Sequence, residues 1–330
     1  MTKALVTGAT GFLGRHTARR LARMGWEVYA QGRNPEQGKQ LEQEGAVFLS
    51  GDLRDPETAY SFCREMDVVF HCAALSSPWG KYKEFYTCNV EATSHVVEGC
   101  KRHNVGRLVH ISTPSVYSSQ RSRFGIRESD PLPGRPANAY AATKLIAEQV
   151  VRQAAREGLA AFMLRPRAIF GPMDNALFPR LLAANESKGV PLMNGGQARL
   201  DLTCVDNVVD AMLLCCEAPV SATGSVYNIT NGEPLRFEEL VTRLFSLLGL
   251  PLHTRRLPYP VAYSAAALME GIYKVLPIPG EPLLTRYSAA ALGISQTLDI
   301  TLAREQLGYQ PRITTDEGLR AFAEWWREQQ

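Results

Sequence analysis

The stretch Lys3-Ala4-Leu5-Val6-Thr7-Gly8-Ala9-Thr10-Gly11-Phe12-Leu13-Gly14 decides the fold class of this chain. It reads as a short apolar strand, a glycine-rich turn and the start of a helix, the order that opens a dinucleotide-binding βαβ unit. Gly8 permits the tight turn, Gly11 lets backbone approach a pyrophosphate, and Gly14 lets the helix pack close to the strand. The GxxGxxG spacing differs from the more usual GxGxxG and also suits a plain tight turn. Its position at the first strand-helix junction favours a phosphate site, so we expect the turn as a whole, with Thr10, Phe12 and Leu13, to contact the cofactor.

The end of the second expected strand, Glu27–Gln31, bears on which dinucleotide binds. An NAD site usually carries an acid there, which holds the ribose 2′-hydroxyl. This strand has none, because Glu27 lies at the wrong end and the strand runs into Gly32-Arg33-Asn34. Arg33 suits a 2′-phosphate, so the sequence favours NADP, with NAD possible. The alternative is that Arg33 is a solvated loop side chain.

Two further apolar runs, 47–49 and 68–70, open into small or polar residues, as expected at the edge of a sheet where a ligand binds. We expect Asp52 and Leu53 to bracket the adenine. The small side chains of Ala73 and Ala74 should let backbone lie near the phosphates.

Two polar residues in this part of the chain have ordinary structural explanations. His71 is interpreted as a packed histidine at a strand end rather than a catalyst. Asn89 is expected at the start of a helix that runs to about Arg102, and a purely structural role at that helix start is the alternative to a functional one.

Tyr140 and Lys144 lie one turn apart in a segment that reads as helix to about Arg156, so they project from one face. An unperturbed tyrosine, with a pKa of roughly 10, is a poor acid or base near neutral pH. A neighbouring ammonium should stabilise the phenolate and lower that pKa. The strand 108–111 ends in Ser112-Thr113-Pro114-Ser115-Val116-Tyr117, and a hydroxyl there would lie in the same crevice as Tyr140.

Composition places the chain among ordinary globular proteins, with 330 residues, 45% hydrophobic and 21% charged. The net charge of +3 gives no reason to expect nucleic acid as a partner. The seven cysteines are an odd number without metal-like spacing, so we expect no metal site, and thiols in a reducing, cytoplasmic compartment. No signal peptide is expected before the first strand.

These segments together resemble an extended short-chain dehydrogenase/reductase of the NAD-dependent epimerase/dehydratase superfamily. The resemblance covers nearly the whole chain and is strongest to the 3β-hydroxysteroid dehydrogenase/isomerase branch and its bacterial relatives that act on 3-oxo acids. The motifs that carry it occur in the family's order: GATGFLG, GDL, HCAA, STPSVY, YAATK, LRPRAIFGP and DLTCVDNVVDA.

The resemblance implies roles for particular residues. Tyr140 would donate or accept the proton, and Lys144 would tune that phenol and hydrogen-bond the nicotinamide ribose. Thr113 matches the family's catalytic hydroxyl and has Ser112 beside it. Because the family often has Ser-Ser there, which hydroxyl touches substrate is left open. Asn89 and Pro166 would complete the cofactor site, with Pro166 near the nicotinamide.

The expected fold is α/β, a doubly wound parallel Rossmann sheet with a smaller, mostly helical substrate lobe. The cofactor domain is expected to span 1–170 and 200–230, and the lobe 171–199 and 231–330. The apolar segment 259–275 is interpreted first as core packing, with a lid over an apolar substrate or a membrane-surface contact as alternatives. It contains Glu270 and Lys274 and makes a poor membrane span. The family resemblance also implies a homodimer, paired through the helices that begin near Asn89 and Tyr140.

The substrate class is predicted from what two positions lack. Sugar-nucleotide epimerases and dehydratases resemble one another in an Asn and an Arg where this chain has Ala168 and Leu200. Neither side chain can hydrogen-bond a diphosphate, and Arg199 should face the opposite side of a strand. We therefore expect an oxidoreductase for an apolar 3-hydroxy or 3-oxo substrate. The alternatives are a sugar-nucleotide enzyme and a non-catalytic NADP-binding protein of the same fold, although the intact Thr113, Tyr140 and Lys144 set favours an enzyme.

Overall fold

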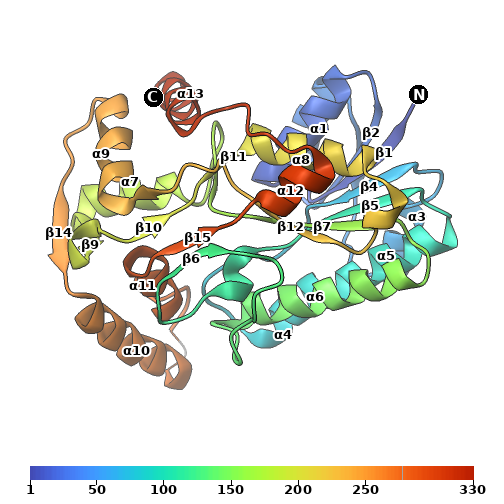
Figure 1. Cartoon of the computed structure of the whole chain (residues 1–330). Coiled ribbons are helices and arrows are strands. Elements are labelled where there is room, and N and C mark those ends of the chain that lie inside the picture. Colours follow the sequence, from blue (N-terminus) through green and yellow to red (C-terminus); the bar gives the residue numbers. More distant parts are fainter. Residues whose placement is uncertain (277) are drawn as a thin grey trace.

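The computed structural model describes residues 1–276 and 278–330 and is built on a seven-stranded parallel sheet. The strand order is β12-β7-β5-β4-β1-β2-β3, so the chain reverses direction across the sheet between β1 and β4. This confirms the expected doubly wound α/β fold (Figure 1). The strands of this sheet are β1 Lys3–Thr7, β2 Glu27–Gly32, β3 Val47–Ser50, β4 Val68–His71, β5 Arg107–Ile111, β7 Ala161–Pro166 and β12 Val226–Ile229.

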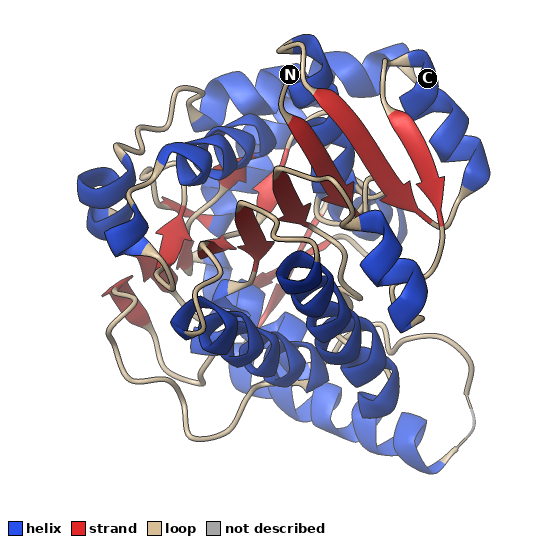
Figure 2. Ribbon diagram, turned by 90° about the vertical axis from the view of Figure 1, so that its right-hand side faces the viewer, coloured by secondary structure: helices blue, strands red, loops and turns tan. Residues whose placement is uncertain are grey.

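Helices cover both faces of the sheet (Figures 1 and 2). One core contains α1, α2, α8 and α12, and the other contains α3, α5 and α6. Their bounds are α1 Phe12–Arg23, α2 Pro35–Gln43, α3 Pro56–Phe62, α5 Ala92–Arg102, α6 Ala139–Arg156, α8 Val205–Glu217 and α12 Thr301–Leu307.

Successive residues of each strand point to opposite faces, so the central strands are mostly apolar along their length. In β1, Ala4 and Val6 belong to the α1–α8 core, and Leu5 belongs to the α3–α5–α6 core. In β4, Phe70 and Val69 divide between the two cores in the same way. The central strands are therefore buried on both faces, whereas the edge strand β3 is partly exposed, with Val47 48% exposed.

The second lobe packs around its own apolar core and contains strands as well as helices. A four-stranded sheet has the order β13-β10-β15-β6, and two-stranded pairs join β11 with β8 and β14 with β9. The strands are β6 Arg123–Ile126, β8 Ile169–Phe170, β9 Val190–Met193, β10 Arg199–Leu200, β11 Thr203–Cys204, β13 Leu235–Arg236, β14 Thr254–Leu257 and β15 Gln296–Leu298. The helices are α7 Phe178–Ser187, α9 Phe237–Leu248, α10 Tyr259–Val275, α11 Arg286–Gly293 and α13 Thr315–Glu328.

The expected domain boundary at residue 231 would place α12 in the lobe, but α12 packs on the cofactor domain. This helix contacts α8 and β12, and Ala303 and Leu307 belong to the core of the seven-stranded sheet. The chain thus returns to the first domain before α13 closes the lobe, where Phe322 packs on Phe178. Within the described residues, no helix is both long and apolar enough to cross a membrane.

Asn89 does not begin a helix, which corrects one expectation. Helical structure already starts with α4, Tyr82–Tyr86, and continues through a π-helical turn, Thr87–Glu91, into α5. Asn89 lies in the middle of the π-turn and is buried. A π-turn inserts an extra residue into a helix and is common at functional sites. Here it directs an amide side chain inward instead of capping a helix end.

The apolar segment 259–275 is a helix, but core packing is the wrong explanation of its large side chains. Leu268 is 68% exposed and Ile272 is 41% exposed. The small Ala262 and Ala266 face the protein instead, because they allow α10 to approach α11 closely. In Figure 1, α10 lies at the edge of the lobe, away from the seven-stranded sheet.

Candidate active site

The turn between β1 and α1 is shaped for close backbone contact. Gly8 has φ +64°, and a Cβ there would lie 2.7 Å from the Cα of Ala73. A Cβ on Gly14 would lie 2.3 Å from the carbonyl oxygen of Gly8, so helix and turn touch directly. Gly11 precedes α1, whose N-terminus has no side-chain cap and no acid in its first turn. An uncapped helix N-terminus beside a glycine turn fits a pyrophosphate, so the residues present suit a dinucleotide.

The remaining residues of this turn brace it. Leu13 is buried in the core, the ring of Phe12 lies edge-on to His16, and Thr10 contacts the neighbouring strand end. A Cβ on Gly32 would lie 2.4 Å from Thr10 Cγ2. No acidic side chain can therefore stand at position 32 without moving the turn.

The end of β2 explains the missing acid. Gln31 is buried, its Oε1 accepts a hydrogen bond from the Gly8 backbone N–H at 3.0 Å, and its Nε2 donates to the Gly51 carbonyl at 2.7 Å. Gln31 thus ties β2 to both neighbouring loops. Beyond it, Arg33 is exposed and its Nη1 lies 3.9 Å from Asp52 Oδ2. Arg54, which was not predicted, pairs with the same carboxylate, and the two guanidinium groups hold the pKa of Asp52 below its usual range, with Arg54 the larger cause.

The loop after β4 is held by Asn89. Its Oδ1 accepts from the Leu75 backbone N–H at 2.7 Å, and its Nδ2 donates to the Leu75 carbonyl at 3.1 Å and to Thr143 Oγ1 at 3.2 Å. Asn89 therefore positions the loop that carries Ala73 and Ala74 against the helix that carries Tyr140. His71 is a packed strand-end residue, as interpreted: it lies between Thr7 and Thr93, and burial lowers its pKa to about 3.

Three predicted cofactor residues occupy places that the fold explains. Leu53 is buried behind Asp52, and its carbonyl accepts a hydrogen bond from His95. Pro166 ends β7 and pairs in register with Ile229 at the carboxyl edge. Ala74 is exposed on the loop that Asn89 holds.

Lys144 is buried beneath the carboxyl edge. Its Nζ donates to the Ile111 carbonyl at 2.6 Å and lies 3.1 Å from His110 Nε2. Burial lowers the pKa of Lys144 to about 8. Burial and the lysine charge push the pKa of His110 well below its usual range, so its ring is neutral and accepts from the ammonium.

A cluster of hydroxyl groups surrounds Tyr140. Its phenol lies near the Thr113 and Ser76 hydroxyls. Thr113 Oγ1 donates to Ser115 Oγ at 2.9 Å, and Ser115 Oγ lies 2.6 Å from the hydroxyl of Tyr287. Burial raises the pKa of Tyr140, and the hydrogen bonds only partly offset this. The expected lowering by Lys144 is therefore absent in this arrangement, because the ammonium is directed at Ile111 and His110.

Ser112 and Thr113 point to different surroundings. Ser112 Oγ donates to Glu148 Oε1 at 2.5 Å, inside a buried pair between Glu148 and Arg165. Arg165 also contacts the hydroxyl of Tyr117. The Ser112 hydroxyl is therefore engaged in the core, whereas that of Thr113 belongs to the Tyr140 cluster.

Sequence reasoning missed four residues near this cluster: Ser76, His110, Arg167 and Tyr287. Ser76 lies two residues after the HCAA motif and His110 two residues before STPSVY, and this proximity was the available signal. Tyr287 comes from α11, and no local pattern links it to Ser115, 172 positions earlier in the chain. Arg167 lay within a quoted motif and was given no role.

The model of the NAD dependent epimerase/dehydratase family matches residues 4–230. The chain belongs to this family. It is an NAD(P)-dependent oxidoreductase of the extended short-chain type. It is 38% identical to the 2-alkyl-3-oxoalkanoate reductase of Stenotrophomonas maltophilia, over 96% of this chain and 97% of that protein.

The chain is also similar to two proteins that act on different kinds of molecule or bind them. The mouse (Mus musculus) sterol-4-alpha-carboxylate 3-dehydrogenase, decarboxylating, is 30% identical over 96% of this chain and 89% of its own. Among solved structures, MoeE5 in complex with UDP-glucuronic acid and NAD superposes with a TM-score of 0.78 at 28% identity, covering 99% of this chain and 100% of the other.

Proposed function

We propose that this enzyme transfers hydride between a nicotinamide and an apolar substrate that carries a 3-hydroxy or 3-oxo group. The observation that carries the proposal is the cluster of Thr113 and Tyr140 above Lys144 at the carboxyl edge of the sheet. Similar proteins are named as a 2-alkyl-3-oxoalkanoate reductase and a sterol-4-alpha-carboxylate 3-dehydrogenase. Both names describe an acid whose carboxylate sits on the carbon beside the oxygenated one.

The residues divide the work as follows. Thr113 holds the reacting oxygen, and Tyr140 gives a proton to it in reduction or takes one in oxidation. Because burial keeps the phenol protonated, Tyr140 is poised as the donor for reduction. Lys144 supplies a positive charge beneath the site. A bound nicotinamide supplies the hydride, while Asn89 and Ser112 hold the loop and the strand end that frame it.

We propose NADP as the preferred cofactor. Gln31 and Gly32 leave no acid for a ribose 2′-hydroxyl, and Arg33 and Arg54 add two guanidinium groups at that edge. The carboxylate of Asp52 lies between them and opposes an incoming phosphate. Titration of both reduced cofactors by fluorescence tests the proposal, and Arg33→Ala should weaken NADPH binding about tenfold while NADH binding stays within twofold. Equal affinities in the unmodified protein, or an unchanged preference in Arg33→Ala, would contradict it.

The rival function is a sugar-nucleotide epimerase or dehydratase. Ala168 and Leu200 oppose it: Leu200 is buried in the lobe core and Arg199 faces solvent on the other side of β10. Ala168 has φ +43°, a backbone conformation that Asn adopts more readily than Ala. The backbone would therefore accept the Asn of the sugar-nucleotide enzymes, yet this chain lacks it. A second rival, a non-catalytic NADP-binding protein, would bind cofactor without any turnover.

One screen separates these functions. The enzyme is assayed with 2-alkyl-3-hydroxy acids, 3β-hydroxysterols and UDP- or GDP-sugars, with both cofactors. Turnover of the acids or sterols supports the proposal. Turnover limited to sugar nucleotides would promote the epimerase, and cofactor binding without any turnover would favour the binding protein.

We also propose a homodimer that pairs through α5 and α6. An open groove on these helices is lined by the apolar Val97, Ile146 and Val150, with Lys101 and Glu157 at its edge. Light scattering of the purified chain should give twice the monomer mass. Val150→Glu should shift it to monomer, and a wild-type monomer would contradict the pairing.

A further inference from the structure

Arg167 is a buried cation whose side chain makes no bond to another described residue. It is 9% exposed, and its Nε has no hydrogen-bond partner within residues 1–276 and 278–330. Its backbone is fully engaged: the N–H donates to Ile229 and the carbonyl accepts from Thr203. A buried guanidinium without an acid is costly, because burial disfavours its charge. Burial accordingly lowers the pKa of Arg167.

Its neighbour in sequence behaves in the opposite way. Arg165 forms a buried ion pair with Glu148 at 2.6 Å, with both nitrogens of one edge on the carboxylate. Asp201 is the acid that faces Arg167, but its Oδ2 accepts from the Leu298 backbone N–H at 2.7 Å and it forms no ion pair with Arg167. Burial raises the pKa of Asp201 to about 6. Among the described residues, no carboxylate therefore forms an ion pair with the Arg167 guanidinium.

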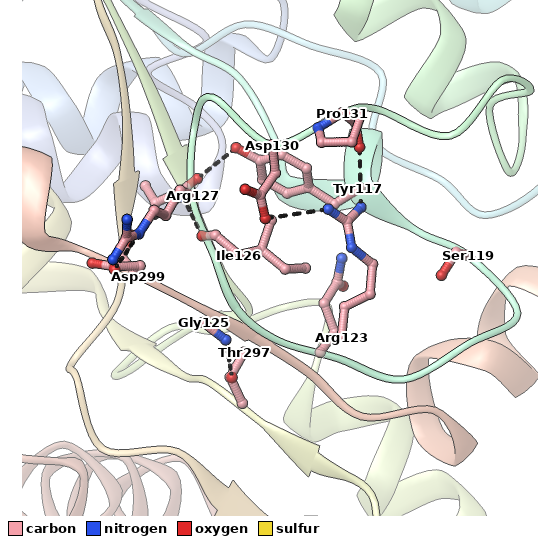
Figure 3. Close-up of polar contacts among 12 residues, drawn as sticks. Tyr117, Ser119, Arg123, Gly125, Ile126, Arg127, Asp130, Pro131, Thr297 and Asp299 are labelled. Carbon is pink, nitrogen blue, oxygen red and sulfur yellow. Dashed lines mark hydrogen bonds and ion pairs between the residues drawn. The ribbon is translucent and has the colours of Figure 1, made fainter.

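Arg167 lines a small hollow of about 20 Å³ between the cofactor domain and the lobe. Tyr117, Ser118 and Ser119 line one side, and Ala290, Ile294 and Gln296 of the lobe line the other. Arg123 also lines it, but its guanidinium turns to Asp130 Oδ2 and the Pro131 carbonyl, at 3.4 Å each (Figure 3). Among the described residues that line the hollow, Arg167 is therefore the buried cation that has no acidic partner.

The hollow adjoins the catalytic hydroxyl groups. The hydroxyl of Tyr287 contacts Ser115, the partner of Thr113. Gln296, from the wall of the hollow, donates to the Pro114 carbonyl at 3.4 Å. A substrate whose oxygen is held by Thr113 and Tyr140 would direct its nearby substituents toward Arg167.

We propose that Arg167 binds the carboxylate of the substrate and so selects 3-hydroxy and 3-oxo acids over neutral ketones, esters and sterols. This rests on the proposed function and deepens it by naming the group that the site recognises. A guanidinium binds a carboxylate with two parallel hydrogen bonds, which fixes both the position and the rotation of the acid. Such a clamp would fix the orientation of the oxygenated carbon relative to Thr113 and Tyr140. Arg167 is in this proposal a substrate-binding residue.

The test compares a 2-alkyl-3-hydroxy acid with its methyl ester, which differ only in charge and one methyl group. In the unmodified enzyme kcat/KM for oxidation of the acid should exceed that of the ester. Arg167→Met should lower kcat/KM for the acid about 100-fold and for the ester less than threefold, since removing one partner of a buried charge pair has effects of this size. Arg167→Lys should recover part of the loss. Arg123→Met, a matched change in the same hollow, should leave the acid-to-ester ratio within twofold.

Binding of the same acid and ester to the enzyme with cofactor is measured in parallel by calorimetry. Acid binding that depends on Arg167 without turnover would sink the proposed reaction and keep the carboxylate site. Equal loss for acid and ester in Arg167→Met, with an unchanged melting temperature, would make the residue structural and overturn the site. So would acid binding that Arg167→Met leaves unchanged, or Arg167-dependent binding of UDP-sugars with none of the acid.

Discussion

The two sides of the active site differ in how completely their polar groups are satisfied. On the cofactor side, Gln31, Asn89 and Lys144 each bond to backbone atoms that define the site. On the side that faces the lobe, the Arg167 side chain has no hydrogen-bond or ion-pair partner among the described residues, and α10 exposes Leu268 and Ile272. The cofactor side is thus preorganised by hydrogen bonds, whereas the lobe side has unmet binding capacity. This difference suits an enzyme whose cofactor is shared with the rest of its family and whose substrate is its own.

The largest effect should come from the phenol at the boundary of the two sides. Tyr140→Phe removes the proton donor, so turnover should fall about 1,000-fold while cofactor affinity stays within a few fold. The matched control is Tyr29→Phe, whose hydroxyl only bonds Glu27. Oxidation of NADPH by a reactive ketone is the measurement. Survival of that activity in Tyr140→Phe would move the proton transfer to another group.

How far the sequence predicted this site follows the same division. The cofactor side comes from residues that are close in sequence and repeat the βαβ order, so local pattern was sufficient for the fold and for Gly8, Gly11 and Gly14. The lobe side depends on packing between distant segments. Tyr287 contacts Ser115 because of how α11 packs in the folded protein, and the hydrophobic periodicity of the sequence does not predict that packing.

Two of the expectations that failed concern helices, and each has a definable physical reason. Asn89 looked like a helix cap because a π-turn has no recognisable sequence signature, and the helix had already begun at Tyr82. The segment 259–275 looked like core because its large apolar residues recur at helical spacing. The alanines at 262 and 266 decided the buried face instead, since small side chains permit the closest approach.

The next effect concerns the stability of the preorganised side. Glu148→Gln leaves Arg165 buried without its acid, and should lower the free energy of unfolding by about 3–5 kcal/mol. The control is Glu98→Gln, which breaks an exposed pair with Arg102 one helical turn away and should cost less than about 0.5 kcal/mol. Urea unfolding followed by circular dichroism measures both. Equal losses would mean that the buried pair adds nothing to the cofactor side.

A smaller effect is expected in the pH dependence of reduction. Burial lowers the pKa of Lys144 from 10.5 to about 8, so the ammonium, and with it kcat/KM for reduction, should be lost as pH rises above about 8. His110→Leu removes an acceptor of that ammonium and should move the alkaline limb to lower pH. His95→Leu, whose ring instead bonds the Leu53 carbonyl, should leave the limb in place. An unmoved limb in His110→Leu would show that another group titrates there.

The same shift has a consequence for folding. Between about pH 8 and 10.5 the unfolded chain holds a proton on Lys144 that the folded protein has released. The free energy of unfolding should therefore rise with pH across this window through this residue. Lys144→Met should flatten that rise.

The smallest effect belongs to α10 and tests whether its apolar face is part of the core. Leu268→Ser should change the free energy of unfolding by less than about 0.5 kcal/mol, because the side chain is 68% exposed and leaves no cavity. Phe322→Ala, in contrast, empties a fully buried position whose ring centroid lies 4.7 Å from that of Phe178, and should cost about 3–5 kcal/mol. Both values come from urea unfolding. A loss above about 2 kcal/mol for Leu268→Ser would mean that α10 is covered in solution. This helix would then no longer belong to the contrast between the hydrogen-bonded cofactor side and the exposed apolar surface of the lobe.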